Sequence, residues 1–101
     1  MYKINEKIIN SNDVESFRAI CHYNEIIMII YIINNQSVLN SSASYIIPGL
    51  PKGYQNAYGV ISGNNGSTRP ISYSSEKGTI EISASGGDLY PTMFGLLVCI
   101  K

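Results

Sequence analysis

Apolar and polar residues alternate along most of the chain, and this period of two predicts β-strands. In the range 79–84, apolar residues at even positions alternate with polar residues, as in a strand with one buried and one wet face. The final strand, expected from about Thr92 to the end, is apolar on both faces. One face carries Phe94, Leu96, Val98 and Ile100, and the other carries Met93, Leu97 and Cys99. Such a strand is either central and covered on both sides, or packs its outer face against another copy of the chain.

Further strands are expected at 16–23, 26–33, 45–47, 57–62 and 69–74, with turn signals between them. Asn24 and Glu25 turn the strand at 16–23 into the isoleucine-rich strand at 26–33, which predicts a hairpin. Residues 26–33 are too few for a membrane-spanning helix, which needs about 20 residues, so no membrane insertion is expected. Short strands without a convincing helix predict an all-β fold, an antiparallel β-sandwich or jelly-roll-like domain.

The chain has 101 residues, enough for one domain. Residues 1–13 are polar and irregular and are expected to form a lead-in, either a short helix or an extended linker. Residues 14–101 are expected to form the β-sandwich domain.

The composition limits the partners. The formal net charge is zero and no Lys/Arg cluster occurs, so nucleic acid is not an expected partner. Charged residues make up 14% of the chain and hydrophobic residues 45%, so part of the surface is expected to be covered by other subunits. This low charge favours the interface alternative for the final strand.

Catalytic and metal-binding patterns are weak. His22 is the chain's one histidine, and its neighbour Cys21 must point to the opposite face of a strand, which makes a nucleophilic pair geometrically poor. One histidine and two distant cysteines give no metal-ligand cluster. We therefore expect no enzyme, no cofactor and no metal. Cys21 and Cys99 are expected to be buried free thiols.

A binding surface is better supported. Tyrosine rings stack on sugars, and amide, carboxylate and guanidinium groups hydrogen-bond sugar hydroxyls, so aromatic and polar loop residues favour a neutral carbohydrate ligand. The competing interpretation is that the asparagines serve turns and the tyrosines cover the edge of the core. The candidate ligand-binding residues are Tyr54, Gln55, Tyr58, Asn64, Asn65, Arg69, Asp88 and Tyr90.

Four features in order carry a resemblance: the paired opening hairpin, the segment Leu50-Pro51-Lys52-Gly53-Tyr54, the strand Gly78-Thr79-Ile80-Glu81-Ile82, and the apolar C-terminal strand. From Val14 onward the chain resembles the C-terminal head (receptor-binding) domains of bacteriophage tail-fibre and baseplate proteins of low-GC Gram-positive hosts. Those domains often continue the tyrosine with Arg-Pro, whereas Gln55 and Asn56 follow here, so the local turn is expected to differ.

The resemblance implies a homotrimer around a threefold axis at the tip of a virion tail fibre. Such a head acts at the bacterial cell surface, where it binds cell-wall saccharides or teichoic acids without catalysis. Three alternatives stay open from the sequence: a structural trimerisation or capping domain that binds nothing, a small trimeric lectin, and a depolymerising enzyme.

Overall fold

The computed structural model describes residues 3–11, 17–84 and 87–101. Within these ranges the chain forms strands and no helix, which confirms the predicted all-β, antiparallel class. No helix among the described residues is long and apolar enough to cross a membrane. The strands are β1 (Asn5–Ser11), β2 (Phe17–Tyr23), β3 (Ile27–Asn34), β4 (Tyr45–Ile47), β5 (Gln55–Ser62), β6 (Thr68–Ser74), β7 (Thr79–Ile82) and β8 (Met93–Ile100).

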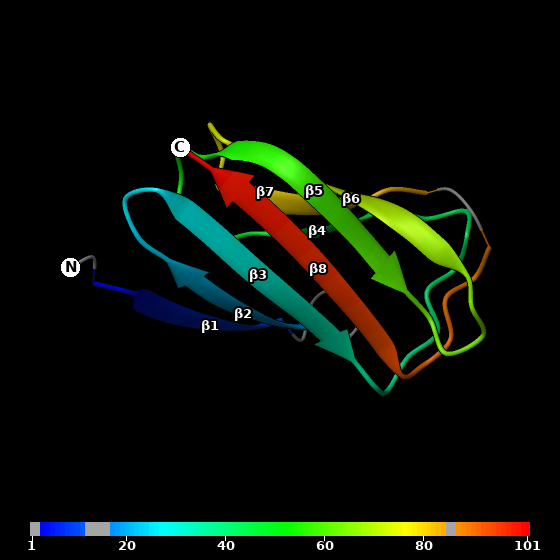
Figure 1. The fold of residues 1–101 in the computed structure, drawn as a ribbon. Helices are drawn as coiled ribbons and strands as arrows, with labels where there is room; N and C mark the ends of the chain where they lie inside the picture. The colour runs from blue at the N-terminus through cyan, green and yellow to red at the C-terminus, as the bar shows by residue number, and fades with distance from the viewer. Residues whose placement is uncertain (1–2, 12–16, 85–86) are drawn as a thin grey trace.

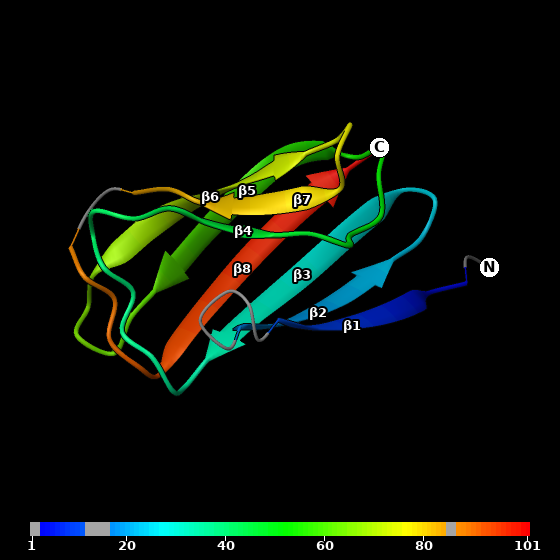
Figure 2. The same cartoon turned by 180° about the vertical axis from the view of Figure 1, so that it is seen from behind.

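The eight strands form one sheet in the order β1-β2-β3-β8-β5-β6-β7-β4 (Figure 1). The sheet curls at β6, whose first residues pair with β5 and whose last residues, from Ile71 to Ser74, pair with β7. β7 and β4 consequently lie across β8 and β3, as seen from behind in Figure 2. The core fills the space inside the curl, where Ile30, Ile32, Leu97, Ile80 and Ile82 are fully buried.

Two glycines allow the curled sheet to close on its own core. A Cβ at Gly59 would collide with the backbone carbonyl of Ile71 on β6. A Cβ at Gly95 on β8 would lie 3.1–3.2 Å from side-chain atoms of Ile71, Ile32 and Ile61. Both positions therefore favour glycine, whose lack of a side chain leaves room for β6 to pack directly over β5 and β8.

The predicted hairpin at the start of the fold is confirmed, because β2 and β3 pair antiparallel. Asn24 makes the turn: its side-chain oxygen accepts hydrogen bonds from the backbone N–H groups of Ile26 (2.8 Å) and Ile27 (3.0 Å). Asn34 at the other end of β3 accepts in the same way from Gln36 and Ser37. These asparagines therefore serve the local turns.

The lead-in differs from both of its predicted forms. β1 is a strand that pairs with β2 along its whole length, from Asn5 opposite Tyr23 to Ser11 opposite Phe17. It lies at the edge of the sheet, so backbone pairing with β2 orders a segment that has few apolar side chains of its own. The predicted boundary between residues 13 and 14 lies outside the described residues.

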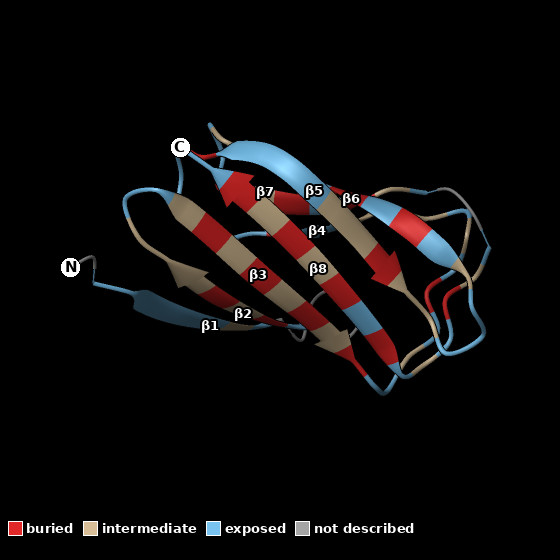
Figure 3. Cartoon of the chain, in the orientation of Figure 1, coloured by how far each residue is buried: buried red, intermediate tan, exposed pale blue. Residues whose placement is uncertain are grey.

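The two faces of β8 are as predicted. Met93, Leu97 and Cys99 are fully buried, whereas Phe94 and Ile100 are exposed, and Leu96 and Val98 are half-buried. β8 lies between β3 and β5, so it is central in the sheet, yet its outer face is not covered by the described residues. Figure 3 shows buried and more exposed positions alternating along β8 and β3.

Candidate functional site

Three segments that are distant in sequence meet at one end of the sheet. Leu39 and Leu89 form an isolated bridge, each N–H donating to the other's carbonyl at 2.9 and 3.0 Å. The loop between β5 and β6 joins them, because the backbone N–H of Asn64 donates to the carbonyl of Tyr90 (2.9 Å). We call this region, residues 39–43, 63–67 and 87–90, the loop end.

Side chains fasten the loop end further. The amide nitrogen of Asn65 donates to the carbonyl of Asp88 (3.0 Å) and to the hydroxyl of Ser67 (3.2 Å). One carboxylate oxygen of Asp88 accepts from the backbone N–H of Ser41 (2.7 Å). Each of the three segments is therefore bonded to another, and the loops hold one another in place before any ligand arrives.

Arg69 supports the loop end from inside the fold. Its side chain is buried, and its guanidinium donates to the carbonyls of Leu39 (2.9 Å), Ala43 (3.1 Å) and Gly87 (3.5 Å). All three donor nitrogens therefore bind backbone of the same chain. The structure places Arg69 beneath the candidate site, whereas the sequence analysis expected it among the ligand-binding residues.

The outward groups of the loop end are an aromatic ring and polar side chains. Tyr90 is 49% exposed, and Asn64 and Asn65 are exposed as well. Asp88 is half-buried. Of the eight predicted ligand-binding residues, the loop end thus brings together four at or near the surface, with Arg69 beneath them.

Tyr54 and Gln55 lie at the opposite end of the sheet, where Gln55 pairs with Ile100 at the end of β8. Tyr54 is buried; its hydroxyl donates to the carbonyl of Asn24 (2.6 Å), and the ammonium of Lys101 lies 4.4 Å from its ring centre. An open hollow of about 410 Å³ adjoins this ring; it is lined by Lys3, Asn5, Tyr23, Asn24, Glu25, Tyr54 and Lys101. The ring of Tyr54 itself serves packing at this end.

Tyr58 lies in neither end region. It is a mid-strand residue of β5, opposite Val98, on the outer side of the sheet, and is 53% exposed. The structure therefore divides the predicted residues among the loop end, the opposite end and the outer side of the sheet, and does not assemble them into one site.

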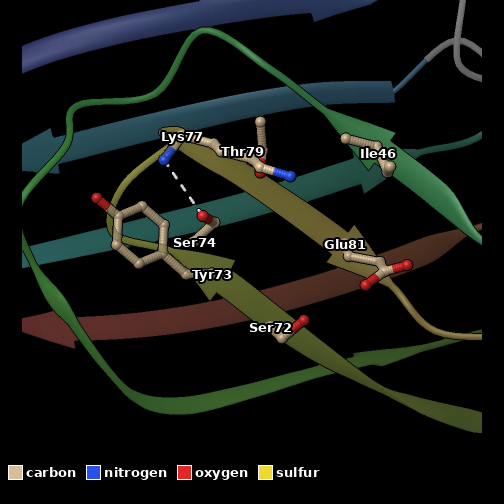
Figure 4. A pocket seen from close by; sticks show the side chains of 7 residues that line it. All are labelled: Ile46, Ser72, Tyr73, Ser74, Lys77, Thr79 and Glu81. Carbon is tan, nitrogen blue, oxygen red and sulfur yellow. Dashed lines mark hydrogen bonds between the residues drawn. The ribbon is translucent and has the colours of Figure 1, made fainter.

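A smaller hollow lies on the far side of the molecule, on the outward face of β6, β7 and β4 (Figure 4). Its volume is about 230 Å³, and its lining includes Ser72, Thr79, Glu81 and Ile46. The backbone N–H of Lys77 donates to the Ser74 hydroxyl at its margin (3.2 Å). The lining offers hydroxyl and carboxylate groups, but the one aromatic residue among them, Tyr73, is buried and donates its hydroxyl to the carbonyl of Pro51.

The outer side of the sheet is the feature that the sequence analysis only partly found. Paired residues share a face, so the register places apolar side chains of β1, β2, β3 and β5 beside those of β8. We call this surface the outer sheet face; it carries Ile8, Ile20, Ile27, Ile29, Tyr31, Ile33, Tyr58, Val60, Phe94, Leu96, Val98 and Ile100. The signal in the sequence was the doubly apolar pattern at 26–33, which resembles that of the final strand.

Cys21 and His22 point to opposite sides of β2. Cys21 is buried in the core, and His22 is on the outer side, 3.7 Å from the Glu6 carboxylate. Both cysteines are free and buried, as predicted. Burial raises the pKa of both thiols from 9.0 to about 11, with the Cys99 thiol adding to the rise at Cys21. Among the described residues, no group of three or more His, Cys, Asp or Glu side chains could hold a metal ion.

No protein-family model, curated protein or solved structure matches this chain.

Proposed function

We propose that this chain is a non-catalytic receptor-binding head domain, of the kind that ends a bacteriophage tail fibre, and that its loop end binds a neutral saccharide of a host cell surface. The observation that carries this proposal is the bonded loop end with Tyr90 exposed on it. Loops that are already ordered lose little conformational entropy on binding, which favours affinity for a small polar ligand.

The exposed groups suit a sugar. The ring of Tyr90 offers an apolar face for the C–H side of a pyranose, and the amides of Asn64 and Asn65 offer donors and acceptors for its hydroxyls. The guanidinium of Arg69 donates its hydrogen bonds to backbone carbonyls, so the described residues of the loop end present no free cation to a phosphate or carboxylate. This favours a neutral saccharide over an anionic polymer.

In this proposal the curled sheet is the jelly-roll-like scaffold of the head, three copies form the working unit, and the unit sits at the virion tail tip. The support for the viral part is the resemblance in residues 50–54 and 78–82 together with the apolar C-terminal strand.

The test is binding to an array of neutral bacterial-surface oligosaccharides, followed by calorimetry on the best ligand. Tyr90→Ala and Asn64→Ala should each weaken binding by about tenfold, because stacking or a well-placed hydrogen bond contributes about 1–1.5 kcal/mol. Ile46→Ala is the matched control, since Ile46 on β4 is similarly exposed (53%) and lies outside both the loop end and the outer sheet face. The proposed site is wrong if Ile46→Ala weakens binding and Tyr90→Ala does not.

A second candidate is a structural assembly domain that binds no ligand. The outer sheet face favours this second function, because a partner subunit can cover its apolar side chains without any ligand. Absence of binding to every saccharide on the array, with an oligomer present, would support this second function.

A further inference from the structure

The outer sheet face is a continuous apolar surface. Its residues align in four rows across the strands; one row runs Ile8, Ile20, Tyr31, Leu96, Val60. Tyr31 lies near the middle, with its ring centre 6.2 Å from that of His22 and 6.0 Å from that of Phe94. Polar residues occupy the margin: Glu6, Asn10, Arg18, His22, Gln55 and Ser62.

The opposite side of the molecule shows that this apolar character is local. The outward positions of β6 and β7 carry Ser72, Ser74, Thr79 and Glu81. Ile46 on β4 is an exposed apolar residue among them. A sheet face that is exposed to water normally carries polar residues, as the outward face of β6 and β7 does. The outer sheet face is apolar instead, which indicates that a partner covers it.

We propose that the outer sheet face is covered by further copies of this chain. Strands lie about 4.8 Å apart and same-face residues about 6.8 Å apart, so five strands and four rows cover about 24 by 27 Å, or about 650 Å². Specific interfaces bury about 600–1,000 Å² of accessible surface on each partner. A patch of this size is therefore sufficient for a stable interface between subunits.

The charges at the margin of the outer sheet face favour a second copy of this chain over other partners. Arg18 and Glu6 bring one positive and one negative charge to the margin of the face, and Glu6 lies 3.7 Å from His22. Opposite charges on one surface let the negative part of this surface on one copy face the positive part on another copy. A cationic rim, which an anionic lipid surface would need, is not present among the described residues of this face.

The expected number of copies, three, rests on the proposed function. The assignment of the outer sheet face as the interface between copies rests on the side chains that line it. Native mass spectrometry and sedimentation of the wild-type chain at about 50 µM should give an oligomer, with three times 11.1 kDa as the expected mass. Ile100→Asp and Phe94→Asp should each raise the dissociation constant at least about 100-fold, because each places an unpaired charge in the interface. Both side chains are about half exposed in the single chain, at 46% and 51%, so the fold should survive, as circular dichroism would show.

Ile46→Asp is the matched control, because Ile46 is 53% exposed and lies on the opposite side; it should leave the oligomer intact. A monomeric wild type, or equal behaviour of all three variants, would overturn the proposed surface. So would a monomer that co-sediments with phosphatidylcholine vesicles, since lipid would then be the occupant. A dimer that Ile100→Asp dissociates would support the surface and refute the number three. An oligomer that binds no saccharide would support the surface while the proposed ligand fails.

Discussion

Arg69 offers the sharpest test of how the loop end is held together. It is one of two arginines in the chain, and the structure gives them opposite environments: Arg69 is buried, whereas Arg18 is exposed on β2. Arg69→Met keeps most of the apolar length of the side chain and removes the donors. Because methionine carries no charge, the change leaves no unpaired buried ion.

The expected loss of stability follows from the bonds. The guanidinium makes two well-formed bonds, to the carbonyls of Leu39 at 2.9 Å and Ala43 at 3.1 Å, and a long one to Gly87 at 3.5 Å. Hydrogen bonds from a charged donor contribute about 1.5–3 kcal/mol each, so the two good bonds give about 3–6 kcal/mol. The carbonyl of Leu39 keeps its bond from Leu89, which places the expectation near about 3 kcal/mol. That is a large part of the about 5–15 kcal/mol by which domains are stable.

Urea unfolding followed by circular dichroism would measure this loss at a protein concentration kept equal among variants. The midpoint should fall markedly for Arg69→Met, while Lys77→Met, at an exposed position outside the outer sheet face, should change the free energy of unfolding by less than about 0.5 kcal/mol. If both variants unfold within about 1 kcal/mol of each other, the carbonyl bonds of Arg69 do not hold the loop end. The guanidinium would then be available to a ligand, as the sequence analysis expected.

Two further changes test the core. The folded-state pKa of Cys21 and Cys99, about 11, lies above the ordinary 9.0, so their contribution to stability is complete below about pH 9 and is lost as the pH rises through about 11. Two pKa units on each thiol correspond to at most about 2.7 kcal/mol, so thermal melts should show a loss of up to about 5 kcal/mol for the pair, and the double alanine variant should lose less over the same pH range. Gly59→Ala should destabilise the fold by about 1–3 kcal/mol or more in urea unfolding, since its Cβ meets the carbonyl of Ile71. A wild-type midpoint for Gly59→Ala would show that β6 does not pack against β5 in this way.

The local pattern of side chains predicted the strands and their faces well. β8 separates Leu97 and Cys99 in the core from Phe94 and Ile100 outside, as its alternation indicated. The expected strand at 57–62 begins two residues earlier, at Gln55. These features were accessible because successive side chains of a strand point to opposite faces, which is a property of neighbouring residues alone.

Residue type alone does not reveal whether a polar group is already bonded within the chain, and this limited how far the candidate ligand-binding residues could be chosen from the sequence. Arg69 and Tyr54 have the chemistry of ligand-binding residues, yet their donors bind backbone carbonyls of this chain. Asn65 is exposed and still bonded to Asp88 across a sequence distance of 23 residues. Such partners are set by loops that meet only in the folded molecule.

The sequence by itself therefore determined an all-β chain, the hairpin of β2 and β3, and a final strand with two apolar faces. The tertiary structure decided that β8 enters between β3 and β5, that β1 extends the sheet, and that the curl at β6 covers one side of β8 and leaves the other open. The physical reason is the range of the interactions. Alternation acts between adjacent residues, whereas strand pairing and the close contact over Gly59 depend on backbone groups that lie far apart along the chain.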